Sequence, residues 1–424
     1  MSDRSTPASG LHQGPDRPAE PTRLALIGAG RFGRFILDAA TNVPQVVPVV
    51  VADVAVDQSA RLAADAGCRA TTVEEALVAA DIDAVVIATP PRTHPELARA
   101  AMHAGKDVFC EKPLATTPDE AARTRALAES LGRVMVIDHV MRYNPLLRAI
   151  QTVQTHLGLE PIRFLFENDA ADESLPRDHW FWDDAVSGGI FVEHGVHFFD
   201  AAAMFVTDPA TSVTAVATSR NGWPSPDLVT ATVKHGSCLA SHTHSFTHAS
   251  RCERQLMRID YGSAEARISG WIPVEAVVDL HVDPAGERAL RDLVSNPDFV
   301  GLGLGLDGWS VDVRARDVAG DLEAKGRGRL FGASRRITVT LSLGGEAAKH
   351  TVYAACVAAA LRDLHDCRTE PGRRPLSGPR TAEAAVVVAD CANRAAALGR
   401  AVAVPTVPQP KPSLVDHVLT KEAF

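Results

Sequence analysis

A glycine-rich turn between an apolar run and a helical pattern is the feature that most constrains the fold. Leu24-Ala25-Leu26-Ile27 is a short apolar run that ends at Gly28-Ala29-Gly30-Arg31-Phe32-Gly33. From Phe32 to Ala40 the apolar residues recur with helical spacing. The glycines permit a tight turn and close approach to the backbone, and a helix N-terminus stabilises an anion. The pattern therefore predicts a strand, turn and helix around the pyrophosphate of a dinucleotide.

An acidic residue at the end of the next apolar run completes this pattern. Val46 to Val51 is rich in β-branched residues and leads into Asp53, which follows Gly33 by 20 positions. A carboxylate there accepts hydrogen bonds from the 2′- and 3′-hydroxyls of a ribose. Residues 54–58 include no arginine or lysine to hold a 2′-phosphate, so the sequence favours NAD over NADP.

Strand-like and helix-like segments alternate as far as Ile137. Ala84 to Ala88 is a further buried run, followed by the turn Thr89-Pro90-Pro91. Thr93 and Thr117 each stand three residues before a glutamate, with proline in the first turn, which predicts two helix starts. Apolar strands separated by amphipathic helices indicate a parallel sheet covered on both faces, and ligands bind at the carboxyl ends of such strands.

The pattern changes after Arg142-Tyr143-Asn144-Pro145. A helix at about 146–157 is predicted, and helices at about 346–366 and 380–398 close the chain. Between them, several segments alternate polar and apolar residues, as half-buried antiparallel strands do. Residues 285–335 are glycine-rich and weakly patterned, and no strand is assigned there. The predicted strands are Ile162–Glu167, Ser212–Ser219, Leu228–Lys234, Met257–Tyr261 and Arg336–Leu343.

Length and composition agree with two soluble domains. The 424 residues exceed one ordinary domain, and 46% hydrophobic with 22% charged residues is typical of a globular protein. We predict a disordered tail (1–21), an α/β Rossmann domain (22–142), an α+β domain with a mostly antiparallel sheet (143–404) and a second tail (405–424). The net charge of −9 argues against nucleic-acid or acidic-membrane partners.

Three features of the sequence bear on the cellular compartment of the protein. No apolar run approaches the roughly 20 residues that span a bilayer, and the polar N-terminus is not a signal peptide. The seven cysteines are dispersed without a CxxC pair. Such a set is typical of reduced thiols, so we expect a cytoplasmic protein.

Glu111-Lys112-Pro113 follows a short buried strand and supplies the first candidate catalytic group. A lysine beside the nicotinamide end of a dinucleotide can donate to a substrate hydroxyl and stabilise the developing alkoxide. Pro113 is a candidate for a cis peptide that aims Lys112. The alternative is a strand end with solvated charges.

Glu193-His194-Gly195-Val196-His197 supplies the second candidate group. Glu193, His197 and Asp200 stand at i, i+4 and i+7, which places them on one face if the segment is helical. Histidine transfers protons near neutrality, and a carboxylate four residues earlier can orient it. The alternative is a buried polar helix face, in which Glu193 only satisfies His197.

Two further clusters give weaker evidence for a functional role. His242, His244 and His248 share a strand face if the alternation holds, but no suitably spaced Cys, Asp or Glu completes a metal site, so no metal is predicted. Trp180 and Trp182 offer aromatic faces for a sugar ring. The alternative for these aromatic residues is that they seal the seam between the domains.

Taken in order, these motifs resemble the Gfo/Idh/MocA family of glucose–fructose oxidoreductases and inositol dehydrogenases. The resemblance runs almost continuously from Arg23 to Pro145 and resumes at Ser187-Gly188-Gly189 and Gly195-x-His197-x-x-Asp200. It implies a Rossmann domain followed by a large open sheet, through which members form homodimers or homotetramers. It also implies oxidation or reduction at a carbinol carbon of a sugar, sugar derivative, glycoside or cyclitol.

The resemblance also assigns residues. Lys112 matches the family's catalytic lysine and His197 its proton-transferring histidine, while Glu193 replaces the usual aspartate. The same site can serve a redox-neutral glycoside hydrolase or epimerase, and a sugar or NAD sensor is a third possibility. Expected cofactor contacts are Gly28, Gly30, Arg31, Phe32, Gly33, Asp53, Thr89, Pro90, His94, Glu111 and Lys112. Expected substrate contacts are Arg142, Tyr143, Trp180, Trp182 and His194.

Overall fold

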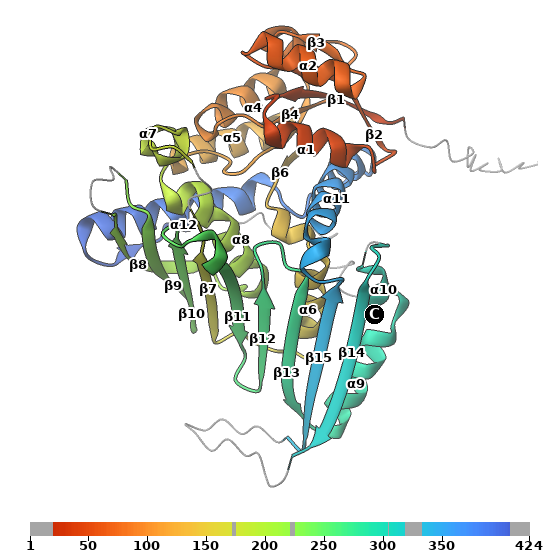
Figure 1. The fold of residues 1–424 in the computed structure, drawn as a ribbon, viewed down its shortest axis with the longest axis vertical. Helices are drawn as coiled ribbons and strands as arrows, with labels where there is room; N and C mark the ends of the chain where they lie inside the picture. The colour runs from red at the N-terminus through yellow and green to blue at the C-terminus, as the bar shows by residue number, and fades with distance from the viewer. Residues whose placement is uncertain (1–19, 172–174, 221–224, 304, 319–332, 408–424) are drawn as a thin grey trace, which may run out of the picture.

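The computed structural model describes residues 20–171, 175–220, 225–303, 305–318 and 333–407. A six-stranded sheet with its helices stands above a ten-stranded sheet, as Figure 1 shows. The predicted fold class, a Rossmann domain followed by an α+β domain, is confirmed. Both predicted tails lie almost entirely outside the described residues.

The first sheet is wholly parallel, with strand order β3-β2-β1-β4-β5-β6. The order reverses between β1 and β4, and ligands of open α/β sheets bind at such a reversal. The strands in this domain are β1 (Thr22–Ile27), β2 (Val46–Ala52), β3 (Arg69–Thr71), β4 (Ala84–Ile87), β5 (Asp107–Cys110) and β6 (Met135–Ile137).

Helices connect these strands, and one of the two predicted caps is present. Thr117 accepts a hydrogen bond from the Glu120 backbone N–H at 3.4 Å, as predicted. Thr93 makes no such cap, because its hydroxyl contacts Thr89 Oγ1 and the Pro90 carbonyl instead. The helices are α1 (Arg31–Ala40), α2 (Val56–Ala66), α3 (Val73–Val78), α4 (His94–His103) and α5 (Pro118–Leu131), with the 3-10 turn η1 (Pro91–Thr93) before α4.

The second sheet is antiparallel except where β7 pairs with β10, and its order is β14-β15-β13-β12-β11-β7-β10-β9-β8-β16. Its strands are β7 (Arg163–Asp169), β8 (Ala210–Thr218), β9 (Leu228–His235), β10 (Cys238–Ser245), β11 (Arg254–Asp260), β12 (Ala264–Ser269), β13 (Glu275–Val282), β14 (Trp309–Asp317), β15 (Arg335–Leu343) and β16 (Val402–Ala403).

Helices cover one face of this sheet and leave the other open (Figure 1). Phe166 of β7 stacks on Phe198 of α8 with ring centroids 3.4 Å apart. Leu239 of β10 points away from the buried Ala240 and is 50% exposed. The helices of this part are α6 (Pro145–His156), α7 (Asp184–Ser187), α8 (Val196–Phe205), α9 (Pro284–Ser295), α10 (Pro297–Gly301), α11 (Lys349–Thr369) and α12 (Pro379–Leu398).

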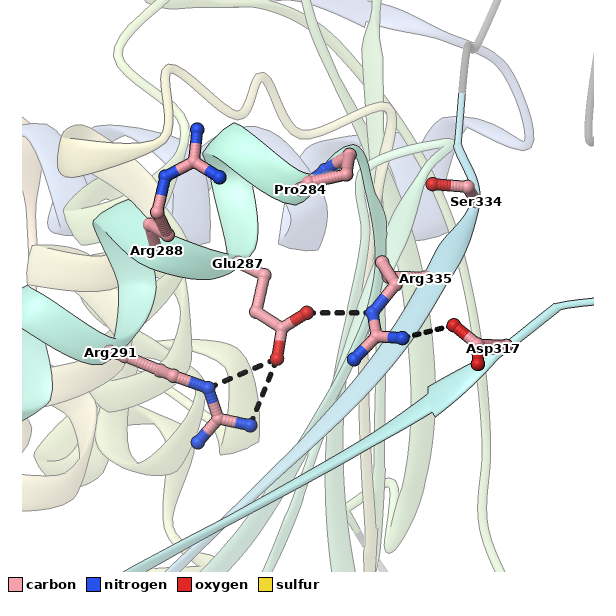
Figure 2. A pocket seen from close by; sticks show the side chains of 7 residues that line it. All are labelled: Pro284, Glu287, Arg288, Arg291, Asp317, Ser334 and Arg335. Atoms are coloured by element: carbon pink, nitrogen blue, oxygen red, sulfur yellow. Dashed lines mark hydrogen bonds and ion pairs between the residues drawn. The ribbon is translucent and has the colours of Figure 1, made fainter.

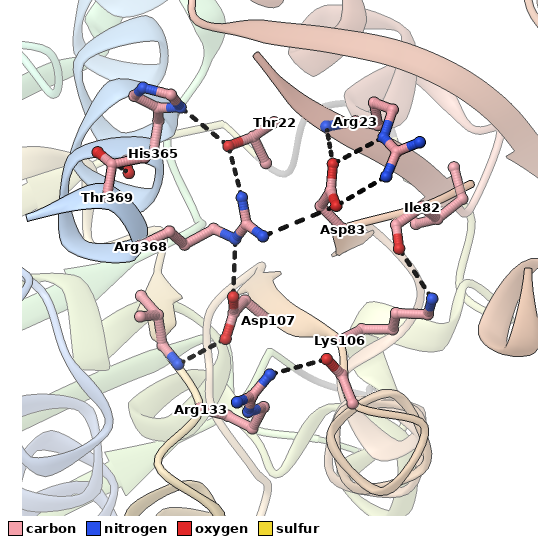
Figure 3. A network of polar contacts seen from close by, with 12 residues as sticks. Thr22, Arg23, Ile82, Asp83, Lys106, Asp107, Arg133, His365, Arg368 and Thr369 are labelled. Atoms are coloured by element: carbon pink, nitrogen blue, oxygen red, sulfur yellow. Dashed lines mark hydrogen bonds and ion pairs between the residues drawn. The ribbon is translucent and has the colours of Figure 1, made fainter. Parts of the chain in front are cut away.

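A polar network joins α11 to the amino ends of the first sheet's strands (Figure 3). Arg368 donates to Asp107 Oδ2 at 2.7 Å and to Thr22 Oγ1 at 2.9 Å, and its Nη2 lies 3.8 Å from Asp83 Oδ1. His365 Nδ1 lies 2.9 Å from the same threonine hydroxyl. These contacts hold the two domains together at the end of the sheet opposite to the glycine-rich turn.

Within the described ranges, no helix is long and apolar enough to cross a membrane. All seven cysteines lie in these ranges, and each is a free thiol.

Candidate active site

The three glycines of the turn have different physical roles. Gly28 has a φ of +108°, and a Cβ there would lie 2.3 Å from the Ala88 carbonyl oxygen of the neighbouring strand end. A Cβ on Gly33 would lie 1.9 Å from the Gly28 oxygen, so helix α1 packs closely on the turn. A Cβ on Gly30 would meet nothing within 4 Å, which leaves space for a ligand against this backbone.

Asp53 lies beside this turn at the end of β2. Its Oδ2 accepts a hydrogen bond from the Ala29 N–H at 2.7 Å, and its Oδ1 accepts one from the Ala55 N–H at 2.8 Å. The neighbouring Val54 side chain is 92% exposed. The carboxylate is therefore held in place by the turn, with an exposed apolar side chain next to it.

His94 ties together the two loops that carry the other predicted cofactor contacts. Its Nε2 lies 2.7 Å from the Thr89 carbonyl oxygen, and its Nδ1 lies 2.8 Å from that of Pro113. The ring is buried, and burial lowers the pKa of His94. Both nitrogens face backbone carbonyls, so the expected direct cofactor contact is corrected to a bridge between loops. The Lys112–Pro113 peptide is cis, as predicted.

Lys112 is paired with Glu193, which joins the first domain to the second. Lys112 Nζ donates to Glu193 Oε1 at 2.7 Å and to the Glu193 carbonyl oxygen at 2.9 Å. Both side chains are largely buried, 13% and 11% exposed. The expectation that Glu193 orients His197 is therefore wrong, because this carboxylate is directed to the lysine.

The local backbone explains the difference. Phe191–Gly195 forms a π-helical turn, η4, before α8 begins at Val196. A π turn closes i→i+5 hydrogen bonds, so residues four apart no longer stand above one another. Glu193 faces Lys112, while Asp200 further along α8 faces Arg142.

His197 is buried close to Lys112, with 4% of its surface exposed. Its Nδ1 has no hydrogen-bond partner among the described residues. Burial, with a further contribution from the Lys112 charge, lowers the pKa of His197 well below its ordinary value. The imidazole is therefore neutral near pH 7 and is able to accept a proton.

Arg142 and Tyr143 are engaged by other protein groups. Arg142 Nε donates to Oδ2 of the buried Asp200 at 2.7 Å, and Arg142 Nη2 donates to Asp200 Oδ1 at 2.8 Å. The buried Tyr143 hydroxyl donates to Asp363 Oδ2 at 2.9 Å. The expectation that Tyr143 contacts substrate is corrected, because its phenol is sealed between η2 (Val140–Tyr143) and α11.

The aromatic segment lies where the second domain meets the first. Trp182 is buried against Phe181 and Phe246, with ring centroids 4.7 and 6.0 Å away. The following helix α7 contacts η1 of the first domain. Trp182 is therefore packed among aromatic rings of its own domain, whereas Trp180 is only partly buried.

His194 and the β10 histidines form a cluster on the covered face of the sheet. His194 Nδ1 lies 3.0 Å from His244 Nδ1, and His242 and His244 do share one strand face. His248 lies beyond the end of β10, near Asp169. Over the described part of the chain, no group of three or more His, Cys, Asp or Glu side chains is placed to hold a metal ion.

Sequence reasoning missed several residues at the centre. The Trp271 ring, in the turn between β12 and β13, lies 5.5 Å from His197 and 5.3 Å from Tyr353 of α11. His139 is fully buried with its ring 6.2 Å from that of His197. In the sequence, the Gly270-Trp271 pair after the predicted strand Met257–Tyr261 was the only local signal for Trp271.

An open hollow elsewhere holds no comparable chemistry. It lies beside α9 and the ends of β14 and β15, far along the second sheet from the first domain (Figures 1 and 2). Most of its charges are engaged in ion pairs, because Glu287 pairs with Arg291 and Arg335, and Arg335 also pairs with Asp317. None of the predicted site residues lines this hollow.

Family models match both domains of the chain. The model of the oxidoreductase family with an NAD-binding Rossmann fold matches residues 22–139, and that of the GFO/IDH/MocA C-terminal domain matches residues 161–264. The rhizopine catabolism protein MocA of Rhizobium meliloti is 30% identical over 64% of this chain and 85% of its own length. Inositol 2-dehydrogenase of Rhizobium meliloti is 29% identical over 46% of this chain, and the match spans 58% of that enzyme.

Solved structures share the fold at low sequence identity. Levoglucosan dehydrogenase in complex with NADH and L-sorbose has a TM-score of 0.69 at 17% identity, covering 92% of this chain and 100% of its own. GenD2 of gentamicin A biosynthesis, in complex with NAD, has a TM-score of 0.66 at 20% identity over 94% of this chain and all of its own. With its ordered motifs and both matched domains, the chain belongs to the Gfo/Idh/MocA family of oxidoreductases, and its first domain is the NAD-binding Rossmann fold of that family.

Proposed function

We propose that the protein is an NAD-dependent dehydrogenase. It oxidises a secondary hydroxyl of a sugar, sugar derivative, glycoside or cyclitol, or reduces the corresponding ketone. One observation carries this proposal: the ammonium of Lys112 and the neutral imidazole of His197 lie close together at the carboxyl ends of a Rossmann sheet. The names of the relatives support the substrate class, since they include an inositol dehydrogenase and a levoglucosan dehydrogenase.

The protein's own groups divide the work at the carbinol carbon. Bound NAD supplies the acceptor for the hydride. His197 takes the hydroxyl proton, because its lowered pKa leaves it unprotonated near pH 7. Lys112 donates a hydrogen bond to the oxygen and stabilises the negative charge that develops there. Glu193 fixes the position of Lys112 through the 2.7 Å ion pair.

The cofactor-binding residues are those of the turn and the adjoining loops. Gly28, Gly30 and Gly33, with Arg31 and Phe32, form the turn and helix start that would hold the pyrophosphate. Asp53 would accept the ribose hydroxyls, while the Thr89-Pro90 turn and the loop of Glu111 and Lys112 would border the nicotinamide. Trp271 and His194 are proposed substrate contacts because they lie near the Lys112–His197 pair, and the partly buried Trp180 is proposed as a third.

We further propose that the protein forms a homodimer or homotetramer through the open face of the second sheet. That face carries Leu239 and Val216, which are 50% and 69% exposed, among threonines and paired charges. An exposed sheet face with apolar side chains is a typical interaction surface.

A panel of sugars, glycosides, inositols and keto-sugars tests the proposed function. Purified protein with NAD is first screened for thermal stabilisation by each compound, and each hit is then assayed for NADH. Accumulation of NADH with a polyol supports a dehydrogenase. Conversion of a sugar without free NADH indicates the redox-neutral hydrolase or epimerase, which uses the same residues. Stabilisation without any conversion of any hit indicates a sensor and contradicts catalysis.

A further inference from the structure

Two carboxyl groups, each with a buried oxygen, follow neighbouring strands close to Lys112. Glu111 and Asp138 are the residues that follow β5 and β6, two parallel strands paired in register at Cys110 and Ile137. The Asp138 backbone N–H continues this pairing by donating to the Cys110 carbonyl at 2.9 Å. The next residues of the two strands are therefore neighbours, and the charges of their carboxyl groups interact.

One oxygen of each carboxyl has no hydrogen-bond donor among the described residues. Asp138 is 2% exposed, and its Oδ1 has no hydrogen-bond partner among the described residues. The same holds for the buried Glu111 Oε1. Two carboxylate ions in contact repel each other, and each accepts hydrogen bonds only. A single proton between them supplies the missing donor and removes one negative charge.

The surroundings contain one cation close to the pair. Lys112 lies on the same loop and is itself paired with Glu193 of η4. The other titratable groups that face the pair are Cys110, Tyr143 of η2 and Cys356 of α11. Burial raises the pKa of Glu111 well above its ordinary value and that of Asp138 to about 6. Burial therefore favours the protonated form of both carboxyl groups, and the pKa of Asp138 lies in a range accessible to experiment.

We propose that Glu111 and Asp138 share one proton and that this pair couples proton binding to the oxidation state of the cofactor. The inference rests on the proposed function, which places the nicotinamide beside Lys112. The ring of NAD carries a positive charge and that of NADH is neutral. Loss of the shared proton adds a negative charge nearby, so it favours NAD. Reduction of the ring removes its positive charge and with it this attraction, and the carboxyl pair then takes up a proton from water.

These residues act through charge and are positioning residues, since no substrate bond changes at them. The coupling predicts the direction in which the relative affinity for the two cofactors changes with pH. As pH rises and the pair ionises, NAD should bind progressively more tightly relative to NADH. Because one proton is involved, the ratio of the two dissociation constants changes by at most tenfold per pH unit. His197 adds nothing to this trend, because its lowered pKa keeps it neutral throughout.

Calorimetric titration with NAD and with NADH tests the coupling. We expect the wild-type ratio of the NADH to the NAD dissociation constant to rise with pH above about 6, by at most tenfold per pH unit. The near-isosteric double variant Glu111→Gln/Asp138→Asn should show a flat ratio and the weaker relative affinity for NAD. Glu74→Gln removes an exposed carboxylate of α3 in the same domain and should retain the wild-type profile.

The outcomes separate this inference from the proposed function. Binding of neither cofactor overturns the proposed function and this inference with it. Binding of both with a flat wild-type ratio, or an unchanged slope in the double variant, overturns only the coupling. A second readout needs no cofactor: the infrared carbonyl band of a protonated carboxyl should be present in the wild type near pH 7 and absent from the double variant. Its absence from the wild type, or its persistence in the variant, contradicts the shared proton.

Discussion

Among single residues, Lys112 shows how the site is assembled from two domains. Its side chain leaves the end of β5, and its partner Glu193 comes from the π-helical turn of the second domain. The Glu193 side chain reaches across this junction. A residue type that looked like a tuning group for histidine in the sequence is instead the group that holds the lysine.

Asp53 provides a prediction on cofactor choice. A carboxylate opposite a 2′-phosphate is a like-charge contact, so NAD should bind more tightly than NADP. The double variant Asp53→Ser/Val54→Arg should shift the preference toward NADP, because it removes the repulsion and adds a cation at an exposed position. Titration of both cofactors measures this. Val78→Arg, at an exposed position of α3, is the control that should leave the preference unchanged. Tighter NADP binding by the wild type would contradict the assignment.

His244 provides a prediction on acid stability. Burial lowers the pKa of His244 from about 6.5 in the unfolded chain to about 3 in the folded protein. The unfolded chain therefore binds the proton more readily, and stability present above about pH 6.5 is lost as pH falls below that value. At pH 5 the loss from this residue is roughly 2 kcal/mol.

Replacement of the ring tests this directly. His244→Phe suits a site among Phe166, Phe191 and Phe198, and its unfolding free energy should fall less between pH 7 and 5 than that of the wild type. Denaturant titration at each pH measures the difference. Exposed His103 gives the control His103→Gln, which should keep the wild-type slope. An equal slope in His244→Phe would refute the expectation.

At the scale of elements, prediction from sequence succeeded where the pattern had one simple cause. The parallel strands of the first domain are buried on both faces, so they read as continuous apolar runs. The glycine-rich turn needs its glycines for φ and for close packing, and those requirements are visible in the sequence. In the second domain, β10 was harder to recognise because two of its buried positions are His242 and His244.

Other elements were beyond sequence patterns for physical reasons. β14 is an edge strand whose residues are all partly or well exposed, so it shows little contrast between its faces. Residues 285–335, left unassigned, also contain α9 and α10, while 319–332 lie outside the described residues. The π-helical turn is set by tertiary packing, and helical periodicity therefore misplaced Glu193 relative to His197.

Helix α11 provides a prediction on how the domains are joined. Arg368→Met keeps the aliphatic stem but removes the contacts to Asp107 and Thr22, and it should lower the unfolding free energy by about 1–2 kcal/mol. The partial exposure of the guanidinium keeps the loss below that of a fully buried pair. Arg23→Met breaks only a more exposed pair within the first domain and should cost less. An Arg368→Met loss no greater than that of Arg23→Met would show that the network does not hold the domains.

At the scale of the whole molecule, the open face of the ten-stranded sheet is exposed to solvent in a monomer. Light scattering should show the wild type as a dimer or tetramer, and Leu239→Arg should shift the mass toward the monomer, because it places a charge on that face. Leu131→Arg, at an exposed position of α5 in the other domain, is the matched control. A monomeric wild type, or an unchanged mass for Leu239→Arg, would exclude this face as the interface.

The central claim is that Lys112 of the first domain and His197 of the second act together in catalysis. The turnover of variants at these two residues tests it most directly. On the substrate identified by the panel, Lys112→Ala and His197→Ala should each lower kcat by roughly 10² to 10⁴-fold. The double variant should lose much less than the product of the two effects, because both groups serve one proton–hydride event. Glu193→Gln should lose less than Lys112→Ala, since it only loosens the lysine. Folded single variants that retain near wild-type kcat would contradict the mechanism.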